Sequence, residues 1–297
     1  MSLKLRSVIP WTGGKHPLRG KLMEHIPKEF ETYFEPFSGA ASLLLMLQPK
    51  KARINDINPW IVLIYYFIKV QPNEFMKQLE KLDEVEDDLI EAKYKNMVVL
   101  FNNNQRKLIK DIPHSLESIQ PLLLKKLLLP VAQFYFICKF SYGGHIWVDD
   151  KGEYNSFTHM SKITGRHLYN EKLILDVSKY LQNDVKFYHG DYSLILKGAK
   201  KGDFIYMDPP YFNSDTENNI AKYSTSAFDY KEQKQLANRY RQLSAKGCFL
   251  LESNTCHVKL TELYKEFKIV RVKVQRLLYV RENEDKNNCF EVLIKNY

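Results

Sequence analysis

The segment from Asp208 to Tyr211, Asp-Pro-Pro-Tyr, combines residue types that could hold an aromatic amine. It follows Phe204–Met207, a wholly apolar run that predicts a parallel strand buried on both faces. The prolines Pro209 and Pro210 remove two backbone donors, so the loop offers mainly acceptors: the Asp208 carboxylate and a backbone carbonyl. Tyr211 adds an aromatic face. Because open α/β sheets bind ligands at the carboxyl ends of their strands, this segment predicts a site.

Such a loop suits methyl transfer to the exocyclic amine of adenine. That amine is a poor nucleophile because its lone pair is delocalised into the ring. Two acceptors that bind both N–H bonds would localise the lone pair and stabilise the positive charge that develops on nitrogen. Stacking on Tyr211 would hold the base, which must first be flipped out of the duplex. The donor is an activated sulfonium, so we expect neither a metal nor a covalent nucleophile.

Composition and charge favour a nucleic-acid partner. The 297 residues are 44% hydrophobic and 27% charged, which predicts one folded catalytic domain with a sizeable insertion. The net charge of +9 favours a polyanion through phosphate contacts. The four cysteines form no C-x-x-C pair, which argues against a zinc ribbon. We expect a soluble intracellular protein, because no signal peptide or membrane-spanning apolar run is recognisable and reduced thiols are the simple interpretation.

Predicted strands and helices alternate along the chain on both sides of the helical region 58–180, which indicates an α/β fold. Apolar segments predict strands at the start of 32–42, at 52–56, 185–188, 204–207 and 248–251, with a final hairpin from 269–278 and 290–295. Helices are expected at 18–25, 43–47, 121–140 and 228–245. Residues 58–180 are mostly helical, so we assign 1–57 and 181–297 to the catalytic domain and 58–180 to an insertion.

One part of the insertion differs from its helical surroundings. The run Asp149-Asp150-Lys151-Gly152 between alternating residues predicts a β-hairpin near 146–154. The hairpin is either a DNA probe or a plain surface excursion, and its aromatic residues face either DNA or the core. The candidate DNA-binding residues are Lys139, Tyr142, Gly144, His145, Trp147 and Arg166.

Taken in order, these segments resemble the Dam-type family (D12 class, alpha group) of DNA adenine N6-methyltransferases. The Asp-Pro-Pro-Tyr segment resembles motif IV of amino-methyltransferases, and it follows Trp11-Thr12-Gly13-Gly14-Lys15, Phe37-Ser38-Gly39 and a helical insertion. The resemblance implies a Rossmann-like sheet that binds S-adenosylmethionine and releases S-adenosylhomocysteine without a metal. It also implies transfer to N6 of a flipped adenine in double-stranded DNA, at GATC or a related site, by a monomer or homodimer.

The resemblance assigns roles to matching positions. Asp208 and Tyr211 would serve catalysis and base stacking. Asp56 would bind the cofactor ribose, and Gly39 would let the backbone approach the cofactor closely. The full cofactor set would be Trp11, Lys15, Glu35, Phe37, Gly39, Asp56, Asp191, Tyr192 and Asp208. Structural alternatives are a core tryptophan at position 11, a turn glycine at 39, and helix capping by Asp56.

The chain departs from the family pattern at two informative positions. Ala41 replaces a usual glycine, which we interpret as a minor change that a negative φ would tolerate. Trp147 stands where relatives carry an arginine that reads guanine, which puts GATC specificity in question. Two other functions stay open: an amino-methyltransferase for cytosine N4 or RNA, and a catalytically silent DNA-binding relative. Asp208 favours adenine, because the cytosine enzymes mostly carry serine there.

Overall fold

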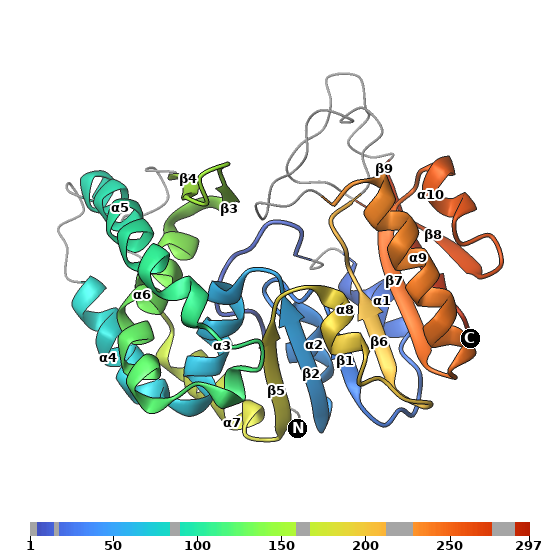
Figure 1. Cartoon of the computed structure of the whole chain (residues 1–297), viewed down its shortest axis with the longest axis horizontal. Coiled ribbons are helices and arrows are strands. Elements are labelled where there is room, and N and C mark those ends of the chain that lie inside the picture. Colours follow the sequence, from blue (N-terminus) through green and yellow to red (C-terminus); the bar gives the residue numbers. More distant parts are fainter. Residues whose placement is uncertain (1–4, 15–17, 84–89, 159–166, 212–227, 275–288) are drawn as a thin grey trace.

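A computed structural model describes residues 5–14, 18–83, 90–158, 167–211, 228–274 and 289–297 (Figure 1). Its main sheet has seven strands in the order β5-β2-β1-β6-β7-β9-β8. The strands are β1 (Tyr33–Glu35), β2 (Lys51–Asp56), β5 (Asp184–His189), β6 (Phe204–Met207), β7 (Phe249–Thr255), β8 (Lys268–Val274) and β9 (Cys289–Lys295). The first five run parallel, and β9 is antiparallel to both β7 and β8. The predicted α/β fold is confirmed.

The sheet has a topological switch point between β1 and β6. From β1 the order extends through β2 and β5 on one side and through β6 and β7 on the other. Strands β1 and β6 pair directly, with Phe34 opposite Ile205. All seven residues of these two strands are buried, as expected of central parallel strands. A switch point opens a crevice at the carboxyl ends of the strands, which is where Asp208 follows β6.

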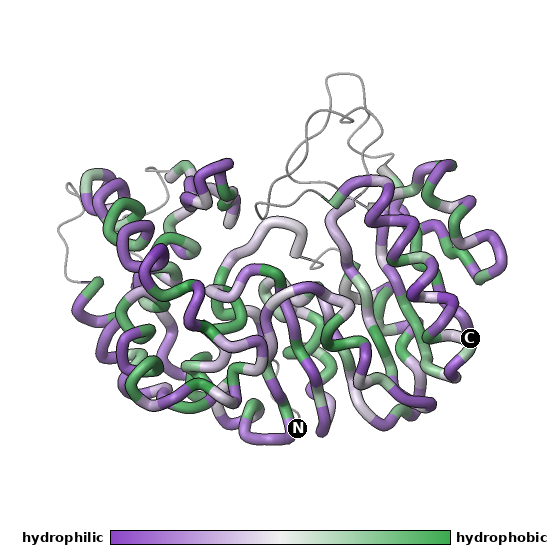
Figure 2. The backbone as a smooth tube through the Cα atoms, viewed as in Figure 1, coloured by the Kyte–Doolittle hydropathy of each residue, from purple (hydrophilic) through white to green (hydrophobic). Residues whose placement is uncertain are grey.

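Alternate residues of the strands pack into two hydrophobic layers. Tyr33 and Tyr206 face a cluster that includes α2 (Ser42–Leu47) and α3 (Pro59–Val70). Phe34 faces a cluster that includes helices on the other side of the sheet. Those helices are α8 (Tyr192–Leu196), α9 (Tyr230–Ala245) and α10 (Val258–Glu262). The hydropathy pattern in Figure 2 follows this layering, with hydrophobic residues in the strands and hydrophilic residues along the outer side of α9.

Helix α3 joins the sheet to the insertion. It begins at Pro59, after Asn58, whose side chain accepts a hydrogen bond from the Trp60 N–H at 3.0 Å. Ten of its twelve residues are buried, because it packs on β2 and β5 and also on α6 (Pro121–Phe140) and α7 (Glu171–Leu181). A helix that is apolar on every side needs such enclosure. The domain boundary at residue 57 stays a prediction.

The other helices are short or belong to the insertion. They are α1 (Arg19–Glu24), α4 (Pro72–Asp83), α5 (Ile90–Leu108) and the 3₁₀ turns Ile109–Asp111 and Leu116–Ser118. Helix α6 has the bounds that the sequence predicts. By length and composition alone α6 could cross a membrane, but 56% of its apolar window is buried inside the molecule. It forms the core of the insertion, against α4 and α5.

A β-hairpin extends directly from α6. Its strands are β3 (Ser141–Val148) and β4 (Tyr154–Thr158), so the expected hairpin exists and is longer than the sequence predicts. Asn102 of α5 holds it through two hydrogen bonds to the Tyr154 backbone, at 2.9 Å and 2.8 Å. Figure 1 shows the hairpin on the same side of the molecule as the carboxyl ends of the parallel strands.

Candidate functional site at the sheet edge

Three acidic residues end or follow three neighbouring strands. Asp56 ends β2, Glu35 ends β1 and Asp208 follows β6. Because these strands are parallel and adjacent, the three carboxyl groups lie in one row along the carboxyl edge. Burial raises the pKa of Glu35 to about 8, and the negative charges of Asp208 and Asp56 raise it further than burial alone. The row therefore behaves as one electrostatic unit.

Backbone N–H groups fix the Asp56 carboxylate. Its Oδ2 accepts from Gly39 at 2.8 Å, and its Oδ1 accepts from Asn58 at 2.9 Å. Burial raises the pKa of Asp56 to about 6 in spite of these donors, which favour the charged form. Asn58, not Asp56, caps α3, so the capping alternative does not explain Asp56. The Ile57 backbone adds a third donor, which leaves one of the four lone-pair positions of the carboxylate for a ligand hydroxyl.

Two residues of the loop between β1 and α2 adopt a left-handed backbone conformation. Gly39 has φ +46° and Ala41 has φ +51°. The expectation that Ala41 has a negative φ is wrong. An L-residue in this region costs about 1–2 kcal/mol. Local hydrogen bonds compensate: the Ala41 N–H donates to Ser38 O at 2.7 Å, and the Ala41 carbonyl accepts from Leu45 at 3.1 Å.

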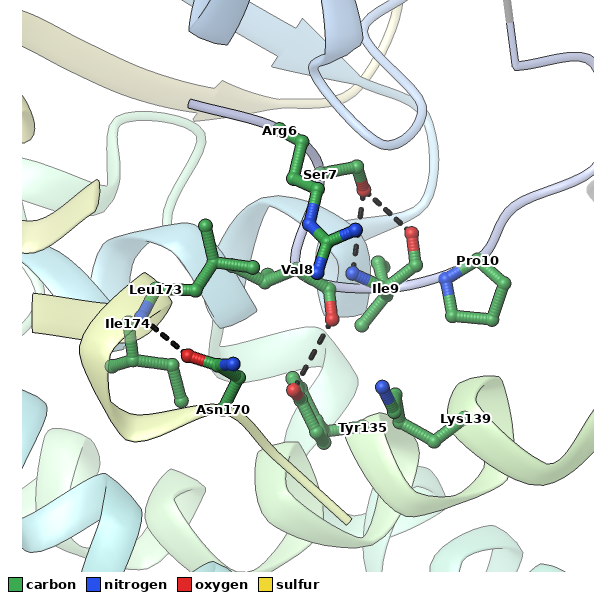
Figure 3. A pocket seen from close by; sticks show the side chains of 10 residues that line it. All are labelled: Arg6, Ser7, Val8, Ile9, Pro10, Tyr135, Lys139, Asn170, Leu173 and Ile174. Atoms are coloured by element: carbon green, nitrogen blue, oxygen red, sulfur yellow. Dashed lines mark hydrogen bonds between the residues drawn. The ribbon is translucent and has the colours of Figure 1, made fainter. Parts of the chain in front are cut away.

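Trp11 covers the loop after β1. A Cβ atom built on Gly39 would lie 3.1 Å from Trp11 Cδ1, so this glycine permits a close approach of the indole. The ring also packs against Phe134 of α6, with centroids 6.3 Å apart. The preceding segment is held to α6 by the Tyr135 hydroxyl, which donates to Val8 O at 3.1 Å (Figure 3). Lys15, its predicted companion in cofactor binding, lies outside the described residues.

A cavity of about 310 Å³ lies beside this N-terminal segment (Figure 3). Arg6, Lys139 and Asn170 are among the residues that line it. Its lining includes none of the three acids of the sheet edge. Lys139, a candidate DNA-binding residue, thus lines a cavity between α6 and the N-terminal segment.

Two partly buried polar contacts hold the Asp-Pro-Pro-Tyr loop. Asp208 Oδ1 accepts from the Ser253 hydroxyl at 2.8 Å, and Ser253 Oγ lies 2.9 Å from the Tyr206 hydroxyl. The Pro210 carbonyl accepts from Gln233 Nε2 at 2.9 Å. The loop is therefore anchored by β7 on one side and α9 on the other.

Behind Gln233 lies a fully buried chain of polar groups. Asn254 Nδ2 donates to Gln233 Oε1 at 3.2 Å and to Glu252 Oε1 at 3.1 Å. Burial raises the pKa of Glu252 to about 7. Gln233 and Ser253 are not among the residues predicted from the sequence. The polar run Glu252-Ser253-Asn254 inside an otherwise apolar strand is the signal that could have found the β7 part of this network.

Tyr211 is fixed by its hydroxyl group. It donates to Glu291 Oε2 of β9 at 2.5 Å. Burial, together with the charges of Asp208 and Glu291, raises the pKa of Tyr211 well above its usual value. The phenol is therefore a neutral donor, and the position of its ring depends on the C-terminal strand.

Three aromatic rings gather near the ends of β1 and β5. Phe37 packs against Tyr192 with centroids 5.0 Å apart and against Phe228, edge to face, at 5.7 Å. Tyr192 and Phe228 lie 6.1 Å apart. Asp191 is exposed and caps α8 by accepting from the Ser193 N–H at 2.9 Å. The resemblance assigns Phe37 and Tyr192 to one cofactor set, whereas Phe228 is not part of that set.

The hairpin presents one buried and one exposed face. Ile146, Val148 and Tyr154 are buried. On the exposed face Trp147 packs against His145 and Phe157, with centroids 5.7 Å and 4.9 Å apart. The Phe157 side chain is 67% exposed.

The remaining predicted DNA-binding residues lie in different places. Tyr142 is 43% exposed. Gly144 is buried against the backbone of Pro10 and Trp11 rather than on the exposed face of the hairpin. Arg166 lies outside the described residues. Within the described ranges, no group of three His, Cys, Asp or Glu side chains is placed to hold a metal ion.

Comparison with known proteins gives one consistent family. Residues 11–278 match the family model described as D12 class N6 adenine-specific DNA methyltransferase. The chain is 29% identical over 308 residues to the type II methyltransferase M.MjaIII of Methanocaldococcus jannaschii, covering 99% of this chain and 100% of that protein. It is 27% identical over 299 residues to the type II methyltransferase M1.LlaDCHI of Lactococcus lactis subsp. cremoris, covering 99% and 96%. It is 26% identical over 274 residues to the DNA adenine methylase of Escherichia coli K12, covering 92% and 89%.

Proposed function

The chain belongs to the D12 class of N6 adenine-specific DNA methyltransferases and methylates adenine in DNA, and from this premise we propose which groups carry the reaction. S-adenosylmethionine is the methyl donor and binds along the edge between Asp56 and Asp208. The observation that carries this assignment is the row of acids at the switch point, where Glu35 ends β1 and Asp208 follows β6, the strand paired with it.

The residues of this edge fit the donor. Asp56 offers a carboxylate lone pair to a ribose hydroxyl, since the backbone donors Gly39, Asn58 and Ile57 use three of its four lone-pair positions. Phe37, Tyr192 and Phe228 offer an apolar, aromatic seat for the adenine ring of the donor. Glu35 Oε2 is buried and has no hydrogen-bond partner within the described residues, which suits a cationic ammonium group.

Two acceptors bind the target amine: the Asp208 carboxylate and one backbone carbonyl. When bound, the donor supplies an electrophilic methyl group. The Ser253 hydroxyl orients the Asp208 carboxylate, which accepts one N–H of the target amine. Gln233 holds the Pro210 carbonyl in place, and we assign the second acceptor to the carbonyl of Pro209, the residue next to Asp208. Both acceptors stabilise the positive charge that develops on N6 as the methyl group arrives. Tyr211, held by Glu291, stacks on the flipped base.

The hairpin and the positive charge serve DNA binding. The net charge of +9 supports association with double-stranded DNA through phosphate contacts. The hairpin of β3 and β4, which carries Trp147 and Phe157, lies on the same side of the molecule as the carboxyl ends of the parallel strands (Figure 1). We assign residues 58–180 to target recognition. Trp147 has no guanidinium group with which to bind a guanine. We therefore propose that the target is a short site containing adenine, and we do not transfer the GATC sequence to this chain.

A transfer assay tests the proposal. Tritiated methyl transfer from S-adenosylmethionine is measured on a random-sequence duplex and on a duplex of dG and dC only, with Asp208→Ala as the matched inactive control. We expect transfer to the first duplex only, and none with the variant. Equal transfer to both duplexes would support cytosine N4 as the acceptor and remove the adenine assignment. Sequencing of modified bases in the methylated DNA then gives the target site.

A further inference from the structure

Gly144 of the hairpin and Gly39 of the loop after β1 both contact the same residue, Trp11. A Cβ atom built on Gly144 would lie 2.6 Å from Trp11 N and 2.7 Å from Pro10 C. A Cβ atom on Gly39 would lie 3.1 Å from the indole Cδ1. Each glycine therefore allows a contact that a side chain would block. Trp11 fills the space between the hairpin and the loop.

The contact at Gly144 is with backbone, so it is the more rigid of the two. Atoms of a flexible side chain could move aside, but Pro10 and Trp11 backbone atoms cannot move without shifting the whole segment. Gly144 also has φ +75°, which favours glycine. The segment has little freedom to yield, because Tyr135 of α6 holds Val8 and Phe134 packs on the indole.

We propose that Gly144 is a positioning residue for the methyl donor. Gly144 lets the hairpin backbone contact Pro10 and Trp11. This contact fixes the position of the indole over Gly39 and hence the conformation of the loop after β1, residues 37–41. Cofactor affinity then depends on the position of the hairpin, and DNA bound at the hairpin changes that affinity. By linkage the cofactor changes DNA affinity by the same factor. This inference rests on the proposed cofactor site.

The hairpin contains a matched control residue. Gly152 has φ +78°, nearly the same as Gly144, but a Cβ atom there would meet nothing within 4 Å. Gly144→Ala and Gly152→Ala therefore impose similar backbone strain on the same hairpin. Only Gly144→Ala pushes on Trp11. The difference between the two variants isolates the contact from the strain.

The experiment measures S-adenosylhomocysteine binding by calorimetry without DNA, and the melting temperature of each protein. We expect Gly144→Ala to weaken binding tenfold or more, and Gly152→Ala to weaken it less than twofold at a similar melting temperature. Equal binding by both variants would overturn the role of Gly144. A wild type that binds no S-adenosylhomocysteine would instead overturn the proposed cofactor site, and the inference with it.

A measurement on the wild type keeps the test decisive if Gly144→Ala does not fold. Hydrogen–deuterium exchange is followed with and without saturating S-adenosylhomocysteine. We expect slower exchange in the loop 37–41 and also in β3, which donates no group to the cofactor. Protection of the loop with unchanged exchange in β3 would overturn the coupling. No protection in either segment would overturn the cofactor site.

Discussion

The sheet edge and the hairpin achieve specificity by different physical means. At the edge, backbone geometry sets the positions of the acids: each ends or follows a parallel strand, and Asp56 is held by backbone N–H groups. On the hairpin, the Tyr154 ring of one face packs against Phe101 of α5 and Phe134 of α6, whereas Phe157 on the other face is 67% exposed. A side-chain change at the edge alters the chemistry, while a change on the hairpin face alters only what is recognised. Trp147, which stands where relatives carry an arginine, is a change of the second kind.

The strongest test of this contrast is Asp208→Ala. Loss of a preorganised charge-stabilising group costs about 100-fold to 1,000-fold in turnover, and here the amine also loses an acceptor that orients it. We expect turnover to fall by at least about 1,000-fold, while S-adenosylhomocysteine affinity changes less than threefold. Single-turnover methylation and calorimetry measure the two quantities. Turnover within tenfold of the wild type would show that the edge does not set the chemistry.

Asp56→Asn should separate cofactor binding from chemistry. Hydrogen bonds to a charged group contribute about 1.5–3 kcal/mol, so we expect cofactor affinity to fall by about 10-fold to 150-fold. Calorimetry with S-adenosylhomocysteine measures the loss. Asp184→Asn is the control, because Asp184 starts β5 at the opposite edge and pairs with Arg53 at 3.0 Å. That variant should bind the cofactor normally and lose at most about 1 kcal/mol of stability.

Asp56 also predicts a pH dependence of cofactor binding. Burial raises the pKa of Asp56 to about 6, so the unliganded enzyme protonates this carboxyl as the pH falls through 6. A protonated carboxyl is a weaker acceptor for ribose hydroxyls. The wild type should therefore bind the cofactor progressively less tightly below pH 6, and Asp56→Asn should show a flatter profile. Parallel profiles in the two proteins would assign the titration to another group.

The sequence located this edge because its signals are local. The apolar run 204–207 coincides with β6, and the predicted strands at 52–56 and 185–188 match β2 and β5 within one residue at each end. Contacts between distant segments were not predictable in this way. The sequence predicts Gly144 as a DNA-binding residue, but nothing in its local pattern indicates the contact with Pro10 and Trp11. Ala41 was misjudged because its φ is imposed by the loop around it and not by its own preference.

On the hairpin, Phe157→Ala should weaken DNA binding without affecting chemistry. Stacking of a base on an aromatic ring contributes about 1–3 kcal/mol, and Phe157 supports Trp147 on the exposed face. We expect DNA affinity to fall about tenfold, with unchanged turnover at saturating DNA and an unchanged slope of log affinity against log salt concentration. Leu122→Ala is the control, since Leu122 is also 67% exposed but lies in the first turn of α6. An equal loss in both variants would contradict a specific role for the ring face.

The smallest effect concerns the stability of the unliganded enzyme. Burial raises the pKa of Glu35 from an ordinary 4.5 to about 8. The folded protein thus holds this proton more tightly than the unfolded chain, and the resulting stabilisation is complete below pH 4.5 and is lost as the pH rises through 8. Glu252, with its pKa raised to about 7, acts in the same direction. The free energy of unfolding should therefore decrease from about pH 5 to about pH 8.5.

Glu35→Gln isolates the contribution of one carboxyl. The amide of this variant cannot ionise, so between about pH 7 and about pH 8.5 the variant should lose about 1 kcal/mol less stability than the wild type. Urea unfolding at both pH values measures this difference, and Glu252→Gln tests whether the second buried carboxyl adds to it. Saturating S-adenosylhomocysteine should reduce the effect in the wild type if its ammonium group pairs with ionised Glu35. If the stability difference between the two proteins persists with ligand bound, the protonation of Glu35 is independent of the cofactor, and Glu35 does not contact the donor.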